Sequence, residues 1–230
     1  MTMISIRQPG YFPYIGFFKK IQSCNIFVYL DDVQYERGDW DNRNKIKTPN
    51  GSMWLTVPVY NKSGQKLNEV QISYDTNWNI KHIKAIELNY QKTLYFSNYW
   101  NSLKNILEKK WVKLVDLNLA LIEYVNQALD INTQTISSSN LKINSVGSQR
   151  LVDICKQLKG STYLSGEMGK DYLDEKIFRK ENIKVIYEKF QHPTYSQIHG
   201  SFIPNLSIID LLFNEGEKSK EILLQSKNTS

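Results

Sequence analysis

The spacing of apolar and polar residues at the start of the chain predicts a βαβ unit. Residues 3–6 alternate as a short strand, and residues 16–22 (GFFKKIQ) have the apolar spacing of a helix. Residues 25–35 (NIFVYLDDVQY) form a β-branched and aromatic run that reaches two aspartates. A strand, a helix and a second strand in this order favour two parallel neighbouring strands. We therefore expect the fold to open with a parallel pair.

The middle of the chain predicts a hairpin followed by helices. The turn sequence PNG at residues 49–51 separates the strand-like runs 44–48 and 53–59, which is a strong hairpin signal. A further strand is predicted at residues 68–74 (NEVQISY). Apolar residues then recur at helical spacing, which predicts a stretch of three helices over residues 78–129.

Strand and helix patterns return in the C-terminal third. They predict, in chain order, a strand at 133–141, a helix at 145–160, a strand at 161–166, a helix at 171–182, a strand at 183–190 and a helix at 207–216. Ser145 or Ser148 is placed near the N-cap of the first of these helices, with Gly160 after its end. Ser207 and Gly216 cap the last one, and a short helix is expected in the tail.

These elements predict a single α/β domain over residues 1–230. Its sheet is expected to be mixed, largely parallel and Rossmann-like in character, with a β-hairpin excursion and a helical insertion at about residues 78–130. The sequence shows no internal repeat and no low-complexity linker. A length of 230 residues allows one core of this kind.

Composition adds a hint about ligands and an expectation about location. The 14 Tyr, 9 Phe and 5 Trp make the chain rich in aromatic residues, which suit both cores and surfaces that stack on flat or sugar-like ligands. Cys24 and Cys155 stand far apart without metal-binding spacing and are interpreted as reduced core thiols. No signal-peptide core and no apolar run of about 20 residues is present, so we expect a cytoplasmic protein without membrane insertion.

The net charge of +6 has two interpretations. The lysines are scattered, which favours a solvated basic surface, and the alternative is an anionic ligand. Nucleic-acid binding rests on charge alone and ranks last among the functions considered.

The first candidate site is the aromatic turn after the first strand, QPGYFPYIGFF at residues 8–18. In an open parallel sheet, ligands bind beyond the carboxyl ends of the strands, which is where this turn begins. Gln8 supplies an amide, Tyr11 an aromatic wall, and the following helix an N-terminus suited to anions. The turn lacks the glycine patterns of known phosphate loops, so a rigid packed turn is the competing interpretation.

The second candidate is the polar segment LDDVQYERGDWDNRNKIK at residues 30–47. Asp31 and Asp32 end a predicted strand, and paired carboxylates serve as a general base or as metal ligands. Arg43 suits phosphate or carboxylate, and Trp40 offers a stacking face. Adjacent aspartates on an extended chain point to opposite faces, so without a bend one of them is expected to cap structure.

Two further candidate sites lie in the C-terminal third of the chain. Gly166 and Gly169 follow a predicted strand and permit close backbone approach, as in a phosphate cradle, although a plain strand-to-helix turn explains them as well. His192 precedes a proline, and Tyr195 and Gln197 alternate onto one side after it. His192 is the best candidate for acid–base chemistry, with a structural histidine as the alternative. The three histidines lack metal-ligand spacing, so no metal is expected.

Together, four stretches resemble the WbqC-like family of bacterial proteins. They are ISIRQPGYFPYIGFFKKI, FVYLDDVQYERGDWDNRNKIK followed by WLTVPV, TYLSGEMGKDYL, and FQHPTYSQIHGSFIPNLSIIDLLFNEG. The resemblance runs in the same order from about residue 4 to 216. It implies functional positions at Gln8, Tyr11, Pro13, Gly16, Asp31, Asp32, Arg43, Gly166, Gly169, Tyr172, His192, Tyr195, Gln197, Ser207 and Asp210.

The resemblance also implies a pathway and a substrate class. Members of the family occur among genes for O-antigen and other surface-polysaccharide synthesis, which points to nucleotide-activated sugars. We expect a transferase that decorates a nucleotide-linked amino sugar by forming an amide, from an activated acyl or aminoacyl donor such as a charged tRNA. His192, Asp32 and Tyr195 are the expected catalytic residues, and Arg43 the diphosphate ligand. The alternatives are a non-catalytic binding or assembly protein of the same pathway, and a nucleotidyltransferase or ligase-like enzyme.

Overall fold

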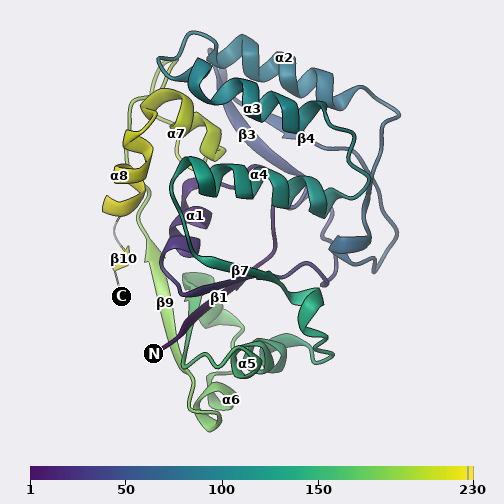
Figure 1. Ribbon diagram of the computed structural model, residues 1–230, viewed down its shortest axis with the longest axis vertical. Coiled ribbons are helices and arrows are strands. Elements are labelled where there is room, and N and C mark those ends of the chain that lie inside the picture. Colours follow the sequence, from purple (N-terminus) through teal and green to yellow (C-terminus); the bar gives the residue numbers. More distant parts are fainter. Residues whose placement is uncertain (227, 230) are drawn as a thin grey trace.

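The protein, described here by a computed structural model, is an α/β fold built on a central parallel sheet. The structure describes residues 1–226 and 228–229. Over these residues, five parallel strands form the central sheet, and small antiparallel hairpins lie outside it. Figure 1 shows helices on both faces of this sheet, with the hairpin strands β3 and β4 beside the helices α2 and α3. The predicted fold class is confirmed.

The main sheet has the strand order β10-β9-β8-β1-β2-β7. Its members are β1 (Met3–Arg7), β2 (Ile26–Tyr29), β7 (Gln134–Ser137), β8 (Thr162–Gly166), β9 (Lys184–Phe190) and the antiparallel edge strand β10 (Asn228–Thr229). The central strand β1 pairs in parallel with β2 and with β8, as the opening βαβ pattern predicts. The strand order therefore reverses at β1, and ligand sites of open α/β sheets lie at such a reversal.

Helices cover the two faces of the sheet with separate apolar clusters. The larger cluster includes residues of α1 (Ile15–Gln22), α4 (Leu114–Ala128), α7 (Ile208–Glu215) and α8 (Lys218–Gln225). The smaller one includes residues of α5 (Gly147–Gln157) and α6 (Glu175–Lys180) on the opposite face. Successive side chains of a strand point to opposite faces of the sheet, which separates the two clusters. In β1, Ile4 and Ile6 join the smaller cluster, while Ser5 between them points to the opposite face.

The middle of the chain builds a second lobe beyond the sheet, and the buried residues of this lobe belong to the larger cluster (Figure 1). It contains α2 (Trp78–Tyr90), α3 (Phe96–Glu108), and the hairpin of β3 (Arg43–Thr48) and β4 (Gly51–Thr56). A short pair, β5 (Val59–Tyr60) and β6 (Gln71–Ile72), flanks them. The three predicted helices of this region and the predicted hairpin turn are confirmed. No helix in the described part of the chain has the length and apolar character needed to cross a membrane.

Several predicted element boundaries are wrong. The expected strand 68–74 consists mostly of a 3-10 turn, Leu67–Glu69, and the two-residue β6. The strand expected at 133–141 ends at Ser137, because the hydroxyls that follow bind aspartates after β2 and curl the chain into a 3-10 turn, Ser138–Leu141. The helix expected at 171–182 begins at Glu175, after a 3-10 turn, Glu167–Asp171.

Helix caps are only partly as predicted. Ser207 caps α7 by accepting a hydrogen bond from the Ile209 amide, and Gly216 ends that helix. Ser145 and Ser148 lie near the N-cap of α5 as predicted, but the N-cap residue is Val146 and no side chain caps the helix. The hydroxyl of Ser145 instead donates to Asp153, and that of Ser148 accepts from the Asp174 amide.

Candidate functional site

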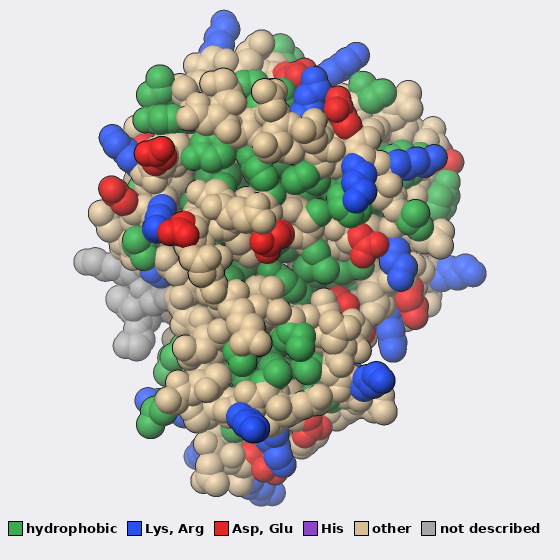
Figure 2. All heavy atoms as spheres, in the orientation of Figure 1, with side chains coloured by type: hydrophobic (Ala, Val, Ile, Leu, Met, Phe, Trp, Pro, Cys, Tyr) green, Lys and Arg blue, Asp and Glu red, His purple; other side chains and the backbone are tan. Residues whose placement is uncertain are grey.

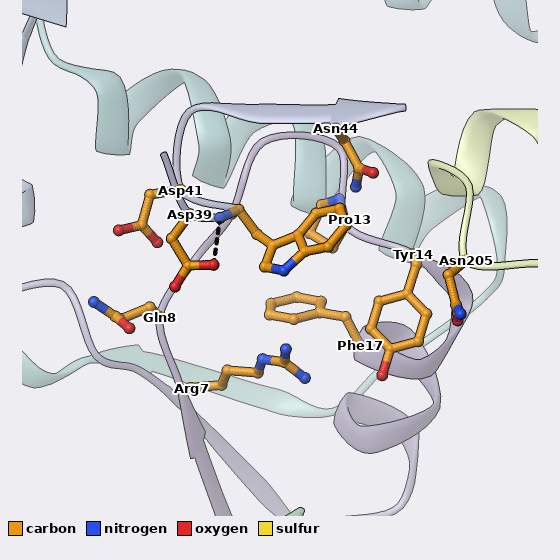
Figure 3. A pocket seen from close by; sticks show the side chains of 11 residues that line it. Arg7, Gln8, Pro13, Tyr14, Phe17, Asp39, Asp41, Asn44 and Asn205 are labelled. Atoms are coloured by element: carbon orange, nitrogen blue, oxygen red, sulfur yellow. Dashed lines mark hydrogen bonds between the residues drawn. The ribbon is translucent and has the colours of Figure 1, made fainter. Parts of the chain in front are cut away.

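A cleft of about 320 Å³ opens where β1 ends and α1 begins. Its walls come from the opening turn, the segment 39–41, the start of β3 and the loop before α7 (Figure 3). They are formed by Arg7, Gln8, Gly10, Pro13, Tyr14, Phe17, Asp39, Trp40, Asp41, Asn44 and Asn205. This is the sheet edge at which the strand order reverses, so the cleft lies where ligands bind in open α/β folds.

One side of the cleft is aromatic. Figure 3 shows Phe17 and Tyr14 side by side, with the Arg7 guanidinium pointing toward them. The Arg7 Cζ lies 5.9 Å from the centre of the Tyr14 ring, a distance that fits a cation–π contact. Trp40 also lines the cleft and is 45% exposed. Flat aromatic faces of this kind suit the apolar faces of sugar rings and bases.

The opposite side carries carboxylates, and Asp41 is the most unusual of them. Its side chain is buried, yet its Oδ2 atom has no hydrogen-bond partner among the described residues. Burial, reinforced by the nearby charge of Asp39, raises the pKa of Asp41 from 3.8 to about 7. A carboxyl with this pKa is suited to exchange a proton near neutral pH, and such groups concentrate at functional sites.

Long-range contacts hold Asp41 in place. The buried Asn118 of α4 donates from Nδ2 to the Asp41 carbonyl at 2.8 Å and to the Pro9 carbonyl at 2.9 Å. The Tyr11 amide donates to the Trp40 carbonyl at 3.1 Å. Asn118 of α4 therefore fixes the two walls of the cleft relative to each other.

Two glycines allow the walls to approach closely. A Cβ on Gly10 would lie 2.8 Å from the Trp40 carbonyl oxygen, and a Cβ on Gly16 would lie 2.5 Å from the Tyr14 ring. Larger residues would therefore displace the 39–41 segment or the Tyr14 side chain. Between them, Phe12 adopts a φ of 46°, which is unusual for a bulky residue, and its carbonyl accepts from Asn44 Nδ2 at 2.5 Å.

Some residues of the turn 8–18 line the cleft, and others are buried in the core. Gln8 and Pro13 line the cleft as predicted for a site wall. Tyr11 is completely buried, and its hydroxyl lies 2.9 Å from Nδ1 of His82 on α2. Burial lowers the pKa of His82 to about 4, so the imidazole is neutral and joins the turn to the second lobe. The structure therefore places Tyr11 behind the wall rather than on its surface.

Asp31 and Asp32 lie outside this cleft and are occupied by protein partners. The chain bends after β2, and the Ser138 hydroxyl contacts carboxylate oxygens of both residues. Ser139 binds Asp31 through its amide and its hydroxyl, at 2.9 Å and 2.7 Å. Arg150 of α5 forms a salt bridge of 2.5 Å with Asp32. These contacts hold the segments after β2 and β7 and the helix α5 together, so both carboxylates serve the packing of the fold.

His192 is not part of the cleft wall and contacts a residue that is. Its Nδ1–H donates to the Pro193 carbonyl at 2.8 Å, and its Nε2 accepts from the Asn205 amide at 3.1 Å. Both ring nitrogens are therefore engaged, and neither is available to a substrate in this arrangement. His192 does not line the cleft, but it contacts the backbone of Asn205, which does.

Tyr195 and Gln197 belong to a buried network centred on Asp210. The Asp210 carboxylate accepts hydrogen bonds from Tyr90 at 2.8 Å, from Tyr195 at 2.9 Å and from Gln197 at 2.7 Å. Lys47 of β3 joins the network by donating to Gln197 Oε1 at 2.9 Å. The network ties β3, α2, α7 and the 195–203 loop together and does not line the cleft.

The predicted glycine cradle is packed against the protein itself. A Cβ on Gly169 would lie 2.0 Å from Ser165 Oγ, and one on Gly166 would lie 3.3 Å from Lys20 Nζ. Close packing therefore explains the need for glycine at position 169. Tyr172 is 68% exposed and, like both glycines, is not part of the cleft wall.

On the face drawn in Figure 2, charge does not single out a nucleic-acid site, because Lys and Arg side chains alternate with Asp and Glu side chains. Among the residues that the structure describes, no three His, Cys, Asp or Glu side chains gather as metal ligands.

The sequence patterns indicate the region of the cleft but do not identify Asp41. Gln8, Trp40 and the segment around them were singled out, whereas Arg7, Asp39 and Asp41 were not. Asp41 stands in the sequence DWDN, where nothing distinguishes it from an exposed acidic residue. The position of Arg7 at the last residue of β1 was an available signal, because that place faces the ligand side of a parallel sheet.

Comparison with known proteins shows the family. The model of the WbqC-like protein family matches residues 8–222, which include almost all of the cleft. The chain is also similar to the uncharacterized protein Rv1507c of Mycobacterium tuberculosis, with 35% identity over 227 residues that cover 97% of this chain and 98% of the relative. The chain therefore belongs to the WbqC-like protein family.

Proposed function

We propose that the protein is a transferase that acts on a nucleotide-linked amino sugar, with Asp41 as the general base. The observation that carries this proposal is the Asp41 carboxyl, which belongs to a cleft-lining residue, has a buried oxygen without a hydrogen-bond partner among the described residues, and has a pKa raised to about 7. A base of this strength removes a proton from a sugar ammonium near neutral pH. The neighbouring Asp39 adds negative charge that attracts the same ammonium.

The other residues of the cleft have roles that fit amide formation. The deprotonated amine attacks the acyl carbon of an activated acyl or aminoacyl donor, forming a C–N bond while the bond from that carbon to its leaving group breaks. The first proton of the ammonium passes to the Asp41 carboxylate before the attack, and the second proton, released when the amide forms, departs with the leaving group. Arg7 stands on the opposite wall, where its cation stabilises the oxyanion that develops on the acyl oxygen. Trp40, Tyr14 and Phe17 supply apolar surface for the sugar ring.

This proposal moves the role of general base from His192 to Asp41. His192 uses both ring nitrogens within the protein, whereas Asp41 lines the cleft and its buried Oδ2 atom has no hydrogen-bond partner among the described residues. The setting in surface-polysaccharide synthesis, including O-antigen synthesis, comes from the family and remains part of the proposal.

The test is binding and turnover of candidate sugars. UDP- and dTDP-linked amino sugars are titrated into the purified protein, and mass spectrometry then follows amide formation with candidate acyl donors. Asp41→Asn is expected to retain binding and to lose turnover by roughly 10²–10⁴-fold, the usual contribution of a general base. Asp171→Asn, which changes an exposed carboxylate, is the control. Absence of binding at millimolar concentration, or binding with no turnover by any donor, would refute the transferase.

A further inference from the structure

A second hollow of about 400 Å³ lies on the hairpin side of the cleft. It is lined by Met53, Trp54, Leu55, Thr56, Pro58, Thr76, Trp78, Lys81, His82 and Ala85, which belong to β4, α2 and the segments next to them. We refer to it as the hairpin groove. The hairpin groove shares an aromatic wall with the cleft, because Trp40 of the cleft contacts Trp54 of the groove with ring centroids 5.4 Å apart.

The floor and the rim of the hairpin groove offer hydrogen-bond donors. Trp78 is 2% exposed, and its Nε1–H has no acceptor among the described residues. A buried donor without a partner is costly, so its presence at a hollow points to an acceptor supplied by a ligand. Lys81 stands on the same wall and is exposed. The rest of the lining includes Met53, Trp54 and Pro58, which provide apolar contact for a flat ring.

Two cations lie against Trp54, a residue of the hairpin groove. The Arg43 Cζ lies 4.4 Å from the centre of the Trp54 ring, and the Lys45 Nζ lies 4.7 Å from it. Arg43 also donates to the carbonyl of Gly38, in the loop that leads to the cleft residues Asp39 and Trp40. The Arg43 Nε–H is buried and has no acceptor among the described residues. Positive charge therefore lies beside Trp54, the groove residue whose ring contacts Trp40 of the cleft.

The cleft alone is small for a nucleotide-linked sugar. Its volume of about 320 Å³ is near the lower limit of ligand sites, which hold about 300–1,000 Å³. We infer that the hairpin groove binds the nucleoside of the same substrate, with the base against Trp54, the diphosphate at Arg43 and Lys45, and the sugar in the cleft. This inference rests on the proposed function, because it assigns the remaining part of the proposed substrate.

The experiment measures nucleoside diphosphates without the sugar. UDP, dTDP and GDP are titrated by calorimetry into the wild-type protein, Trp54→Ala, Lys81→Gln and the matched control Lys84→Gln, which removes an exposed lysine of the same helix outside the groove. We expect at least one of these nucleotides to bind. Trp54→Ala is expected to weaken it about tenfold, as for the loss of one base–aromatic contact. Lys81→Gln is expected to weaken it severalfold, and Lys84→Gln to leave it unchanged.

The outcomes separate this inference from the proposed function. If turnover depends on Asp41 while Trp54→Ala and Lys81→Gln bind the nucleotide as tightly as wild type, the groove assignment is overturned and the transferase stands. If the nucleotide binds in a Trp54-dependent way but no amide forms, the groove assignment stands and the transferase fails. If no nucleotide binds the wild-type protein, the groove assignment is overturned. Circular dichroism of Trp54→Ala, and the milder Trp54→Phe, distinguish lost binding from lost folding.

Discussion

Asp41→Asn is expected to stabilise the folded protein at alkaline pH while it abolishes the proposed chemistry. Burial and the charge of Asp39 raise the pKa of Asp41 from 3.8 to about 7, so the fold favours the neutral carboxyl. Each pKa unit corresponds to about 1.4 kcal/mol, so ionised Asp41 costs the fold up to about 4 kcal/mol above pH 7. Asparagine has the same shape without the charge.

The sign of the pH dependence follows from the raised pKa. The stabilising contribution of a carboxyl with a raised pKa is present at low pH and is lost as the pH rises from 3.8 to about 7. At pH 5 only part of this loss has occurred, and at pH 8 it is complete. The stability difference between Asp41→Asn and wild type is therefore expected to grow by about 2–3 kcal/mol from pH 5 to pH 8.

Urea denaturation at the two pH values measures this difference. For a chain of this size, 1 kcal/mol corresponds to about 2–4 °C in melting temperature, so thermal melts at pH 8 are expected to show an increase of roughly 5–15 °C. Asp171→Asn, at an exposed position, serves as the control and is expected to show a small difference at both pH values. A difference for Asp41→Asn that is independent of pH, or a less stable variant at pH 8, would show that Asp41 is not a strained buried carboxyl.

Three further predictions concern the scaffold around the cleft. Gly10→Ala places a methyl group 2.8 Å from the Trp40 carbonyl and is expected to cost about 1–3 kcal/mol and to weaken substrate binding, measured by denaturation and calorimetry. Burial lowers the pKa of His82 from 6.5 to about 4, so the free energy of unfolding is expected to fall by up to about 3 kcal/mol as the pH drops through this range. His82→Gln is expected to reduce this pH dependence, measured by urea denaturation at several pH values. Asp210→Asn leaves the donors of Tyr90 and Tyr195 without a carboxylate and is expected to cost about 1–3 kcal/mol in chemical denaturation; an unchanged midpoint would contradict the buried network.

Local patterns were sufficient for most of the fold. The parallel pair β1 and β2, the hairpin of β3 and β4, and the helices α2, α3 and α4 follow from periodicity and turn residues, which are properties of neighbouring positions. The predictions that failed are those in which distant partners compete with the local pattern. Ser138 and Ser139 end β7 early because their hydroxyls bind Asp31, more than a hundred residues away in sequence.

The sequence by itself determined the family, the α/β class and the sheet edge at which the candidate site lies. Only the tertiary structure decided which side chains face the cleft, because orientation and burial depend on residues far apart in the chain. Tyr11 and Asp41 illustrate this. Tyr11 is buried against His82 of α2, whereas Asn118 of α4 binds the carbonyl of Asp41 and holds that residue at the cleft wall. The raised pKa of Asp41 arises from that burial, which no local pattern records.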